Sequence, residues 1–191
     1  MKILWDFDGT LFDTYPVYVD TLAEVVPRLM NTFLKEQMMA AMKVSFSSGF
    51  QALGVTAEEE QTYRQTLLHI SPERFLPFKG VEAILERAEL NVIMSHKERA
   101  VIEAVLEQYG FQKYFREIVT PEMGFARKPD SASYVYLHER YQLDLAVGDR
   151  ALDLIPAKSI GLQTLMFQGD CEAADYSINT YDEMMTHFKS F

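Results

Sequence analysis

Two aspartates, Asp6 and Asp8, flank one phenylalanine at the point where an apolar run over residues 2–5 ends. Side chains two positions apart on a strand point to the same side, so the two carboxylates share a face. Neighbouring carboxylates repel each other unless a cation lies between them or one is protonated. The pair therefore indicates chemistry, and Gly9 permits the tight turn that a closely bound ligand needs. A plain turn is the alternative, because Asp, Gly and Thr are common turn residues.

Further polar side chains follow the later apolar runs of the chain: Ser95, His96, Lys128, Asp149 and Asp153. In a doubly wound sheet, ligands bind beyond the carboxyl ends of the strands, so these groups are expected to meet there. Carboxylates from two strand ends suit Mg²⁺, which takes oxygen ligands. A hydroxyl and an ammonium group suit a phosphate. The set therefore predicts a site for a metal ion and a phosphorylated ligand.

Apolar runs that alternate with amphipathic segments would position these groups. The runs predict five buried strands, at residues 2–5, 90–94, 118–119, 143–147 and 163–167. Helical patterns occupy residues 80–89, 97–109, 131–141, 153–159 and 180–190. This alternation predicts an α/β fold with a parallel sheet of about five strands and helices on both faces. Pro156 favours a helix that begins near Asp153, because proline is tolerated in the opening turn, and Asp153 as a simple helix N-terminal acid is the alternative.

One interval, residues 14–78, breaks the alternation. It lacks a convincing strand and contains helical stretches at residues 16–30, 33–43 and 56–69. We therefore predict an all-helical second domain at 14–78, inserted into a core formed by residues 1–13 and 79–191. Residues 45–50 interrupt the helical pattern, and a substrate-contacting loop and a plain turn are both compatible with this break.

The composition limits the class of protein. The chain has 191 residues, is 48% hydrophobic and carries a net charge of −10, which argues against nucleic acid or an anionic membrane as partner. Its one cysteine, Cys171, cannot form an internal disulfide, which fits a reducing compartment. The first apolar run is too short for a signal peptide, and no run approaches the length of a membrane span. These features predict a cytoplasmic protein. We expect it to be a monomer or weak dimer, although the sequence does not determine the oligomeric state.

In this order, the residues resemble four motifs of the haloacid dehalogenase-like hydrolase superfamily. The motifs are Asp6-Phe7-Asp8-Gly9-Thr10-Leu11, then Ser95, then Lys128-Pro129, then Gly148-Asp149 with Asp153. The insert is similar to the helical cap of the phosphoglycolate phosphatase-like branch. The resemblance implies a Rossmann-like core, a cap that closes over the substrate, and Mg²⁺-dependent hydrolysis of a small phosphorylated metabolite such as phosphoglycolate or a sugar phosphate.

The resemblance also implies a role for each acid. Asp6 would be the nucleophile that forms an aspartyl-phosphate, and Asp8 would act as general acid and then as general base. Mg²⁺ would be bound by the side chain of Asp6, the backbone carbonyl of Asp8, and Asp149. Asp153 would be a further ligand or would support the others.

The phosphate group would be held by residues from three of the motifs: Ser95 and Lys128, with Gly9, Thr10 and His96. An acid at position 8 favours phosphoryl chemistry over dehalogenation. Two alternatives stay open. A phosphomutase differs only in which hydroxyl accepts the phosphoryl group from Asp6, and a non-catalytic member would only bind a phosphorylated ligand or a partner.

Overall fold

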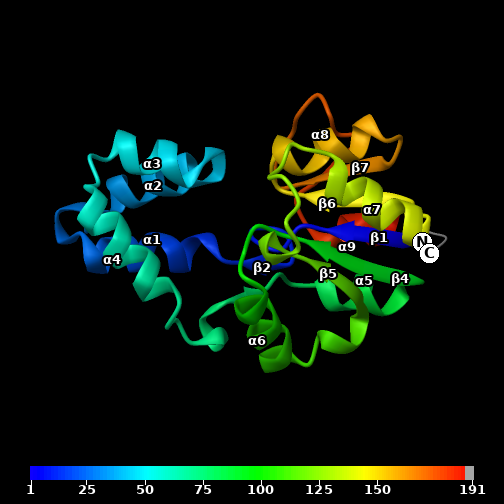
Figure 1. Cartoon of the computed structure of the whole chain (residues 1–191), viewed down its shortest axis with the longest axis horizontal. Helices are drawn as coiled ribbons and strands as arrows, with labels where there is room; N and C mark the ends of the chain where they lie inside the picture. Colours follow the sequence, from blue (N-terminus) through cyan, green and yellow to red (C-terminus); the bar gives the residue numbers. More distant parts are fainter. Residues whose placement is uncertain (188–191) are drawn as a thin grey trace. The chain divides into compact units, whose positions relative to one another are not determined.

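The computed structural model describes residues 1–187, and these residues form two compact units. The core unit consists of Met1–Phe12 and Pro77–Phe191, and the helical unit consists of Asp13–Leu76 (Figure 1). The junctions between the units are two short strands, β2 (Phe12–Asp13) and β3 (Leu76–Pro77), which pair with each other. None of the helices within residues 1–187 combines the length and the apolar character needed to cross a bilayer.

The core unit contains a parallel sheet that has six strands in the described part of the chain, in the order β5-β4-β1-β6-β7-β8. These strands are β1 (Lys2–Trp5), β4 (Leu90–Met94), β5 (Phe115–Val119), β6 (Leu145–Gly148), β7 (Gln163–Phe167) and β8 (Tyr176–Ile178). The predicted α/β class and the five predicted strands are confirmed. The sixth strand, β8, lies at an edge, and two of its three side chains are exposed, so it has no apolar run.

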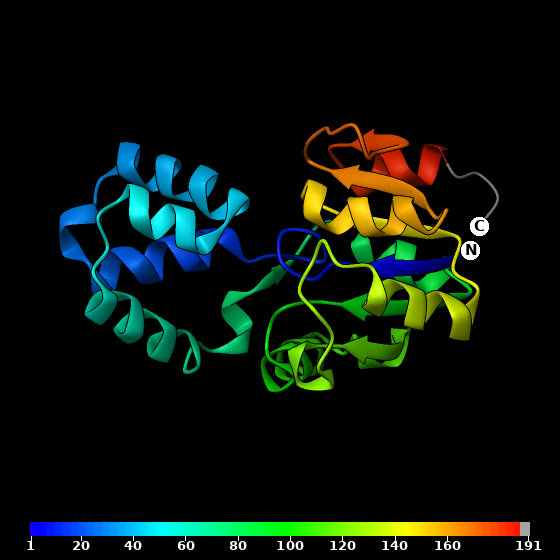
Figure 2. The same cartoon turned by 45° about the horizontal axis from the view of Figure 1, so that its top comes forward.

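Helices cover both faces of this sheet (Figure 2). On one face, α7 (Ala132–Tyr141) and α8 (Ala151–Ser159) pack over a cluster that includes Leu4, Val92 and Ala146. On the other face, α5 (Val81–Arg87) contacts α9 (Tyr181–His187), and the ring of Tyr181 meets Trp5 of β1. The core unit also contains α6 (Arg99–Tyr109) and two 3₁₀ turns, η3 (Gln112–Tyr114) and η4 (Pro121–Met123). The predicted helix over 180–190 is present as far as His187, and its last residues lie outside the described part.

Helix α8 begins earlier than predicted. It starts at Ala151 instead of near Asp153, and Pro156 lies inside it. The prediction assumed that proline occupies only the opening turn. The early start is explained by Asp153, whose Oδ2 accepts a hydrogen bond from the amide of Arg150 at 3.1 Å and so closes the first turn.

The helical unit contains helices over the three stretches predicted for this interval, and also two helical segments that were not predicted. They are α1 (Tyr15–Val25), η1 (Pro27–Leu29), α2 (Thr32–Val44), α3 (Phe46–Ala52), α4 (Ala57–Leu67) and η2 (Pro72–Arg74). Edge-to-face and tilted aromatic contacts join Tyr18, Phe46, Phe50 and Tyr63 in its interior. The predicted break at 45–50 is wrong in extent, since α3 occupies most of it. Ser45 alone separates α2 from α3, and it caps α3 by accepting from the amide of Ser48 at 3.0 Å.

Candidate active site

The site lies where the strand order reverses. From β1 the chain adds β4 and β5 on one side of the sheet, and it then adds β6, β7 and β8 on the other side. Such a switch point leaves a crevice beyond the carboxyl ends of the two central strands. Asp6 directly follows β1, and Asp149 directly follows the neighbouring β6. The amide of Asp6 donates to the carbonyl of Val147 at 2.9 Å, which fixes the two strand ends together.

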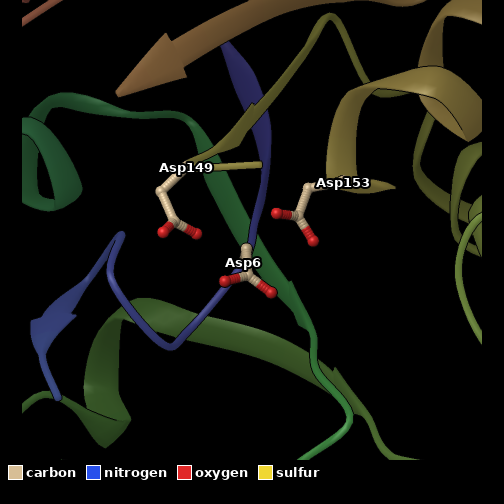
Figure 3. A group of neighbouring side chains, drawn as sticks. All are labelled: Asp6, Asp149 and Asp153. Atoms are coloured by element: carbon tan, nitrogen blue, oxygen red, sulfur yellow. The ribbon is translucent and has the colours of Figure 1, made fainter. Parts of the chain in front are cut away.

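Among the described residues, Asp6, Asp149 and Asp153 form a buried acidic cluster (Figure 3). One carboxylate oxygen from each lies within 4.8 Å of the others. Gly148 makes this approach possible, because a Cβ atom there would lie 2.4 Å from the Cβ of Asp153. Oδ2 of Asp6 is buried and accepts no hydrogen bond within the described chain. A buried set of carboxylate oxygens that includes Oδ2 of Asp6 fits a hard divalent cation such as Mg²⁺.

Lys128 supplies the positive charge of the cluster. Its ammonium group donates to Oδ1 of Asp6 at 2.5 Å and to Oδ1 of Asp153 at 2.7 Å, and only 1% of its side chain is exposed. Burial alone would lower the pKa of Lys128, but the charges of Asp153 and Asp6 outweigh it and raise the pKa above its ordinary value. Lys128 therefore stays charged and orients both carboxylates.

The acids that share Lys128 differ in their protonation. Burial, followed by the charge of Asp153, raises the pKa of Asp6 to about 6, although Lys128 opposes the shift. For Asp153, burial also acts to raise the pKa, but Lys128 and Arg150 outweigh it and lower the pKa below its ordinary value. Asp153 is thus the more readily ionised of the two carboxyl groups that share Lys128.

Asp8 lies in a different environment from Asp6. Its Oδ1 pairs with the ammonium group of Lys97 at 3.2 Å, and 22% of its side chain is exposed, against 3% for Asp6. The side chain of Asp8 is absent from the described acidic cluster. The two acids that share a strand end are therefore separated in the fold, one buried on Lys128 and the other nearer the surface on Lys97. Metal binding through the backbone carbonyl of Asp8 stays a prediction.

The predicted phosphate-binding residues occupy the same edge of the sheet. Ser95 is 2% exposed, and its Oγ accepts from the amide of Lys97 at 3.1 Å. Nε2 of His96 accepts from the amide of Lys128 at 3.0 Å, which joins the ends of the second and third motifs. Burial, followed by the charge of Lys128, lowers the pKa of His96 to about 4, so its ring is neutral and can accept this bond.

Gly9 and Thr10 form the turn after Asp8. Gly9 has a φ of 75°, and its amide donates to the carbonyl of Phe12 at 2.9 Å within the same turn. The hydroxyl of Thr10 is buried and makes no hydrogen bond within residues 1–187, while its carbonyl accepts from the hydroxyl of Tyr181 at 2.7 Å. The contacts of Gly9 and Thr10 with a phosphate remain predictions.

Sequence reasoning missed several residues at this edge. Nε of Arg150 lies 3.9 Å from Oδ1 of Asp149 and 3.5 Å from Oδ2 of Asp153, so it adds a second positive charge to the cluster. Arg150 stands between two predicted acids in the sequence, and Lys97 comes two residues after Ser95. Their proximity to predicted site residues was the available signal.

The comparison with known families agrees with this geometry. Residues 3–167 match the model of the haloacid dehalogenase-like hydrolase family. The chain belongs to this family. The resemblance inferred from the four motifs is therefore confirmed, and the match spans the core strands from β1 to β7 together with the insert.

Individual relatives of this haloacid dehalogenase-like hydrolase are distant. A phosphoglycolate phosphatase of Vibrio cholerae is 24% identical over 83% of the chain and 80% of its own length. An N-acetylmuramic acid 6-phosphate phosphatase of Pseudomonas aeruginosa is 21% identical over 85% of the chain and 79% of its own length. A hydrolase from Streptococcus pneumoniae with a known crystal structure has a sequence 26% identical to this chain. The two structures align with a TM-score of 0.72 over 99% of this chain and 98% of that one. The family and these relatives support an enzyme that hydrolyses phosphate monoesters.

Proposed function

We propose that this hydrolase is a Mg²⁺-dependent phosphatase that cleaves a small phosphorylated metabolite through an aspartyl-phosphate on Asp6. The observation that carries the proposal is the buried ammonium group of Lys128, which donates to both Asp6 and Asp153 beside the third acid, Asp149. This arrangement holds a nucleophilic carboxylate in place and provides positive charge for a phosphoryl group.

A metal ion would be bound by Asp6 and Asp149, with Asp153 as a ligand or support and with the backbone carbonyl of Asp8. When bound, Mg²⁺ would stabilise the negative charge that develops on the phosphoryl oxygens. The donor set fits, because the buried oxygens of this cluster are carboxylates and Oδ2 of Asp6 accepts no hydrogen bond within residues 1–187.

The residues of the chain would perform two displacements. A carboxylate oxygen of Asp6 attacks the phosphorus, the ester P–O bond breaks, and Asp8 gives a proton to the leaving oxygen. Asp8 then takes a proton from the attacking water, the bond between phosphorus and Asp6 breaks, and inorganic phosphate leaves. Ser95 and Lys128 would bind the phosphoryl oxygens in both steps. Lys97, which forms an ion pair with Asp8, would hold the carboxyl group of Asp8 in the position from which it transfers protons.

The helical unit, Asp13–Leu76, is proposed as the cap that selects the substrate. Its compactness as a separate unit and its attachment through β2 and β3 support this role. Phosphoglycolate or a sugar phosphate is the proposed substrate class, supported by the two phosphatases named above, whose names specify small phosphorylated molecules. We further propose that the enzyme acts in the cytoplasm as a monomer or weak dimer.

The proposal is tested with a panel of phosphorylated metabolites, by measuring phosphate release with Mg²⁺ and with a chelator. Asp6→Asn should abolish turnover and covalent labelling, because an amide does not accept the phosphoryl group. Asp8→Asn should slow turnover by about 10²–10⁴-fold, as expected for loss of proton transfer, and still become phosphorylated by acetyl phosphate. Mass spectrometry of acid-quenched protein distinguishes the two variants. Full turnover in chelator, or the same phosphate adduct on both variants, would refute the proposal. If the enzyme converts a sugar phosphate into its isomer without releasing free phosphate, it is a phosphomutase instead.

A further inference from the structure

The turn that carries Asp8 is held by a residue from the far end of the chain. We call residues 7–12 the Asp8 turn. Inside it, the amides of Gly9 and Leu11 donate to the carbonyls of Phe12 and Phe7, at 2.9 Å and 3.1 Å. From outside, the hydroxyl of Tyr181 donates to the carbonyl of Thr10 at 2.7 Å, across 171 positions of sequence.

The ring of Tyr181 is held from several sides. It stacks on Phe167 with ring centroids 4.5 Å apart and planes 11° apart, and it meets the edge of Trp5 at 5.9 Å. A Cβ atom on Gly80 would lie 3.3 Å from the Cβ of Tyr181, so the backbone before α5 lies close behind it. The residue is fully buried. The hydroxyl therefore reaches Thr10 from a rigid position, and making this bond costs little side-chain entropy.

The surroundings of Tyr181 also keep its hydroxyl a donor. Burial, followed by the charges of Asp149 and Asp6, raises the pKa of Tyr181 well above its ordinary value. The hydroxyl is therefore protonated at neutral pH and can donate.

We propose that Tyr181 is a positioning residue for phosphoryl transfer, which fixes the Asp8 turn through the carbonyl of Thr10 and so places the carboxyl group of Asp8. Tyr181 lies beyond residues 3–167, the segment that matches the family model, so the edge segment β8–α9 contributes to the working site. The inference rests on the proposed function, in which Asp8 donates a proton to the leaving group.

Removing only the hydroxyl isolates this effect. Tyr181→Phe keeps the ring and its stacking but leaves the buried carbonyl of Thr10 without its donor, which is unfavourable. Asp8 lies two residues before Thr10, and a misplacement of about 1 Å in a reacting group can reduce a rate about 10²-fold. The loss should be largest where proton donation matters most, on an alkyl phosphate with a basic leaving group. An aryl phosphate such as p-nitrophenyl phosphate needs little protonation of its leaving oxygen and should lose less.

The matched control is Tyr114→Phe, which also removes one tyrosine hydroxyl. That hydroxyl donates to Glu82 and Glu86, both at 2.9 Å, and Tyr114 immediately precedes β5, at the amino edge of the sheet opposite the site. We expect Tyr181→Phe to lower kcat/KM, which reports the step that releases the leaving group, about tenfold or more on an alkyl phosphate and no more than about threefold on the aryl ester. The control should retain wild-type values on both substrates.

Rates are compared at a temperature at which the emission of Trp5, the single tryptophan of the chain, shows that each variant is folded. Equal losses on both substrates, or none, would overturn the inference, because a merely structural role scales all rates with the folded fraction. Phe167→Leu, which loosens the ring but keeps the hydroxyl, should show the same selectivity to a smaller extent, and it decides the question if Tyr181→Phe does not fold. A wild-type enzyme that releases phosphate from neither substrate would refute the proposed function itself.

Discussion

Replacing Lys128 with methionine should expose the repulsion within the acidic cluster. The ammonium group that donates to Asp6 and Asp153, at 2.5 Å and 2.7 Å, would be lost, while the apolar stem and most of the volume remain. Both carboxylates would stay buried without their shared positive charge. Asp149, with an oxygen within 4.8 Å of them, would add to the repulsion.

The size of the effect follows from this geometry. Breaking a buried ion pair by removing one partner costs about 3–5 kcal/mol. Lys128 serves two carboxylates, which would increase the cost, but Asp6 has its pKa raised to about 6 by burial and can take up a proton to relieve part of it. We therefore expect a loss of about 3–5 kcal/mol in the free energy of unfolding. For a chain of this size, that loss lowers Tm by about 6–20 °C.

The assay is thermal unfolding in chelator at neutral pH, followed by circular dichroism. Lys158→Met is the matched control, because Lys158 pairs with Asp175 at the surface, with 46% of the lysine side chain exposed. An exposed pair contributes about 0–1 kcal/mol, so the control should melt close to the wild type. Added Mg²⁺ should restore part of the lost stability in Lys128→Met, because a cation that binds only the native state stabilises it. Equal melting temperatures for Lys128→Met and Lys158→Met in chelator would refute the reasoning.

Two further predictions concern the neighbours of the cluster. Gly148→Ala should lower the free energy of unfolding by about 1–3 kcal/mol and weaken Mg²⁺ binding, because the new Cβ would lie 2.4 Å from the Cβ of Asp153. Urea unfolding measures the first effect, and calorimetric titration with Mg²⁺ measures the second. Wild-type values in both assays would show that the backbone before α8 shifts to accommodate the Cβ. His96, whose pKa is lowered to about 4 first by burial and then by Lys128, should stay neutral in the native state at pH 5. Its folded-state pKa lies below the ordinary 6.5, so its stabilisation is fully present above pH 6.5 and is lost as the pH falls toward 4. A His96 resonance that titrates near pH 6.5 in the NMR spectrum would contradict this.

The elements of the core were predictable where one physical cause dominates. Parallel strands buried on both faces appear as continuous apolar runs, and β1, β4 and β7 have such runs. The edge strand β8 could not be found in this way, because Tyr176 and Ser177 are exposed. The start of α8 was misplaced because a general rule about proline was given more weight than the capping carboxylate of Asp153.

The site was predictable as a set of residues but not as a geometry. The ends of the predicted strands indicated which polar side chains would lie at the site. The sequence did not show that β1 pairs with β6, the pairing that brings Asp6 beside Asp149, because no local pattern encodes strand order. The ion pair between Asp8 and Lys97 could have been suspected from the nearness of Lys97 to Ser95. Tyr181 left no such signal, because its partner is a backbone carbonyl, which any residue at position 10 would supply.

The overall charge of −10 and the proposed substrate have the same sign, and the local charges explain how the two are compatible. Among the described residues, the three acids of the cluster face two basic side chains, Lys128 and Arg150, so the cluster alone would repel a phosphate. Burial, followed by the charge of Asp153, raises the pKa of Asp6 to about 6, close to neutrality, where protonation would weaken it as a nucleophile. A divalent cation would reverse the sign of the cluster and lower that pKa at once. In the proposed mechanism, one bound cation would therefore both attract the substrate and activate Asp6, the buried acid of the cluster, whereas Asp8 is paired with Lys97.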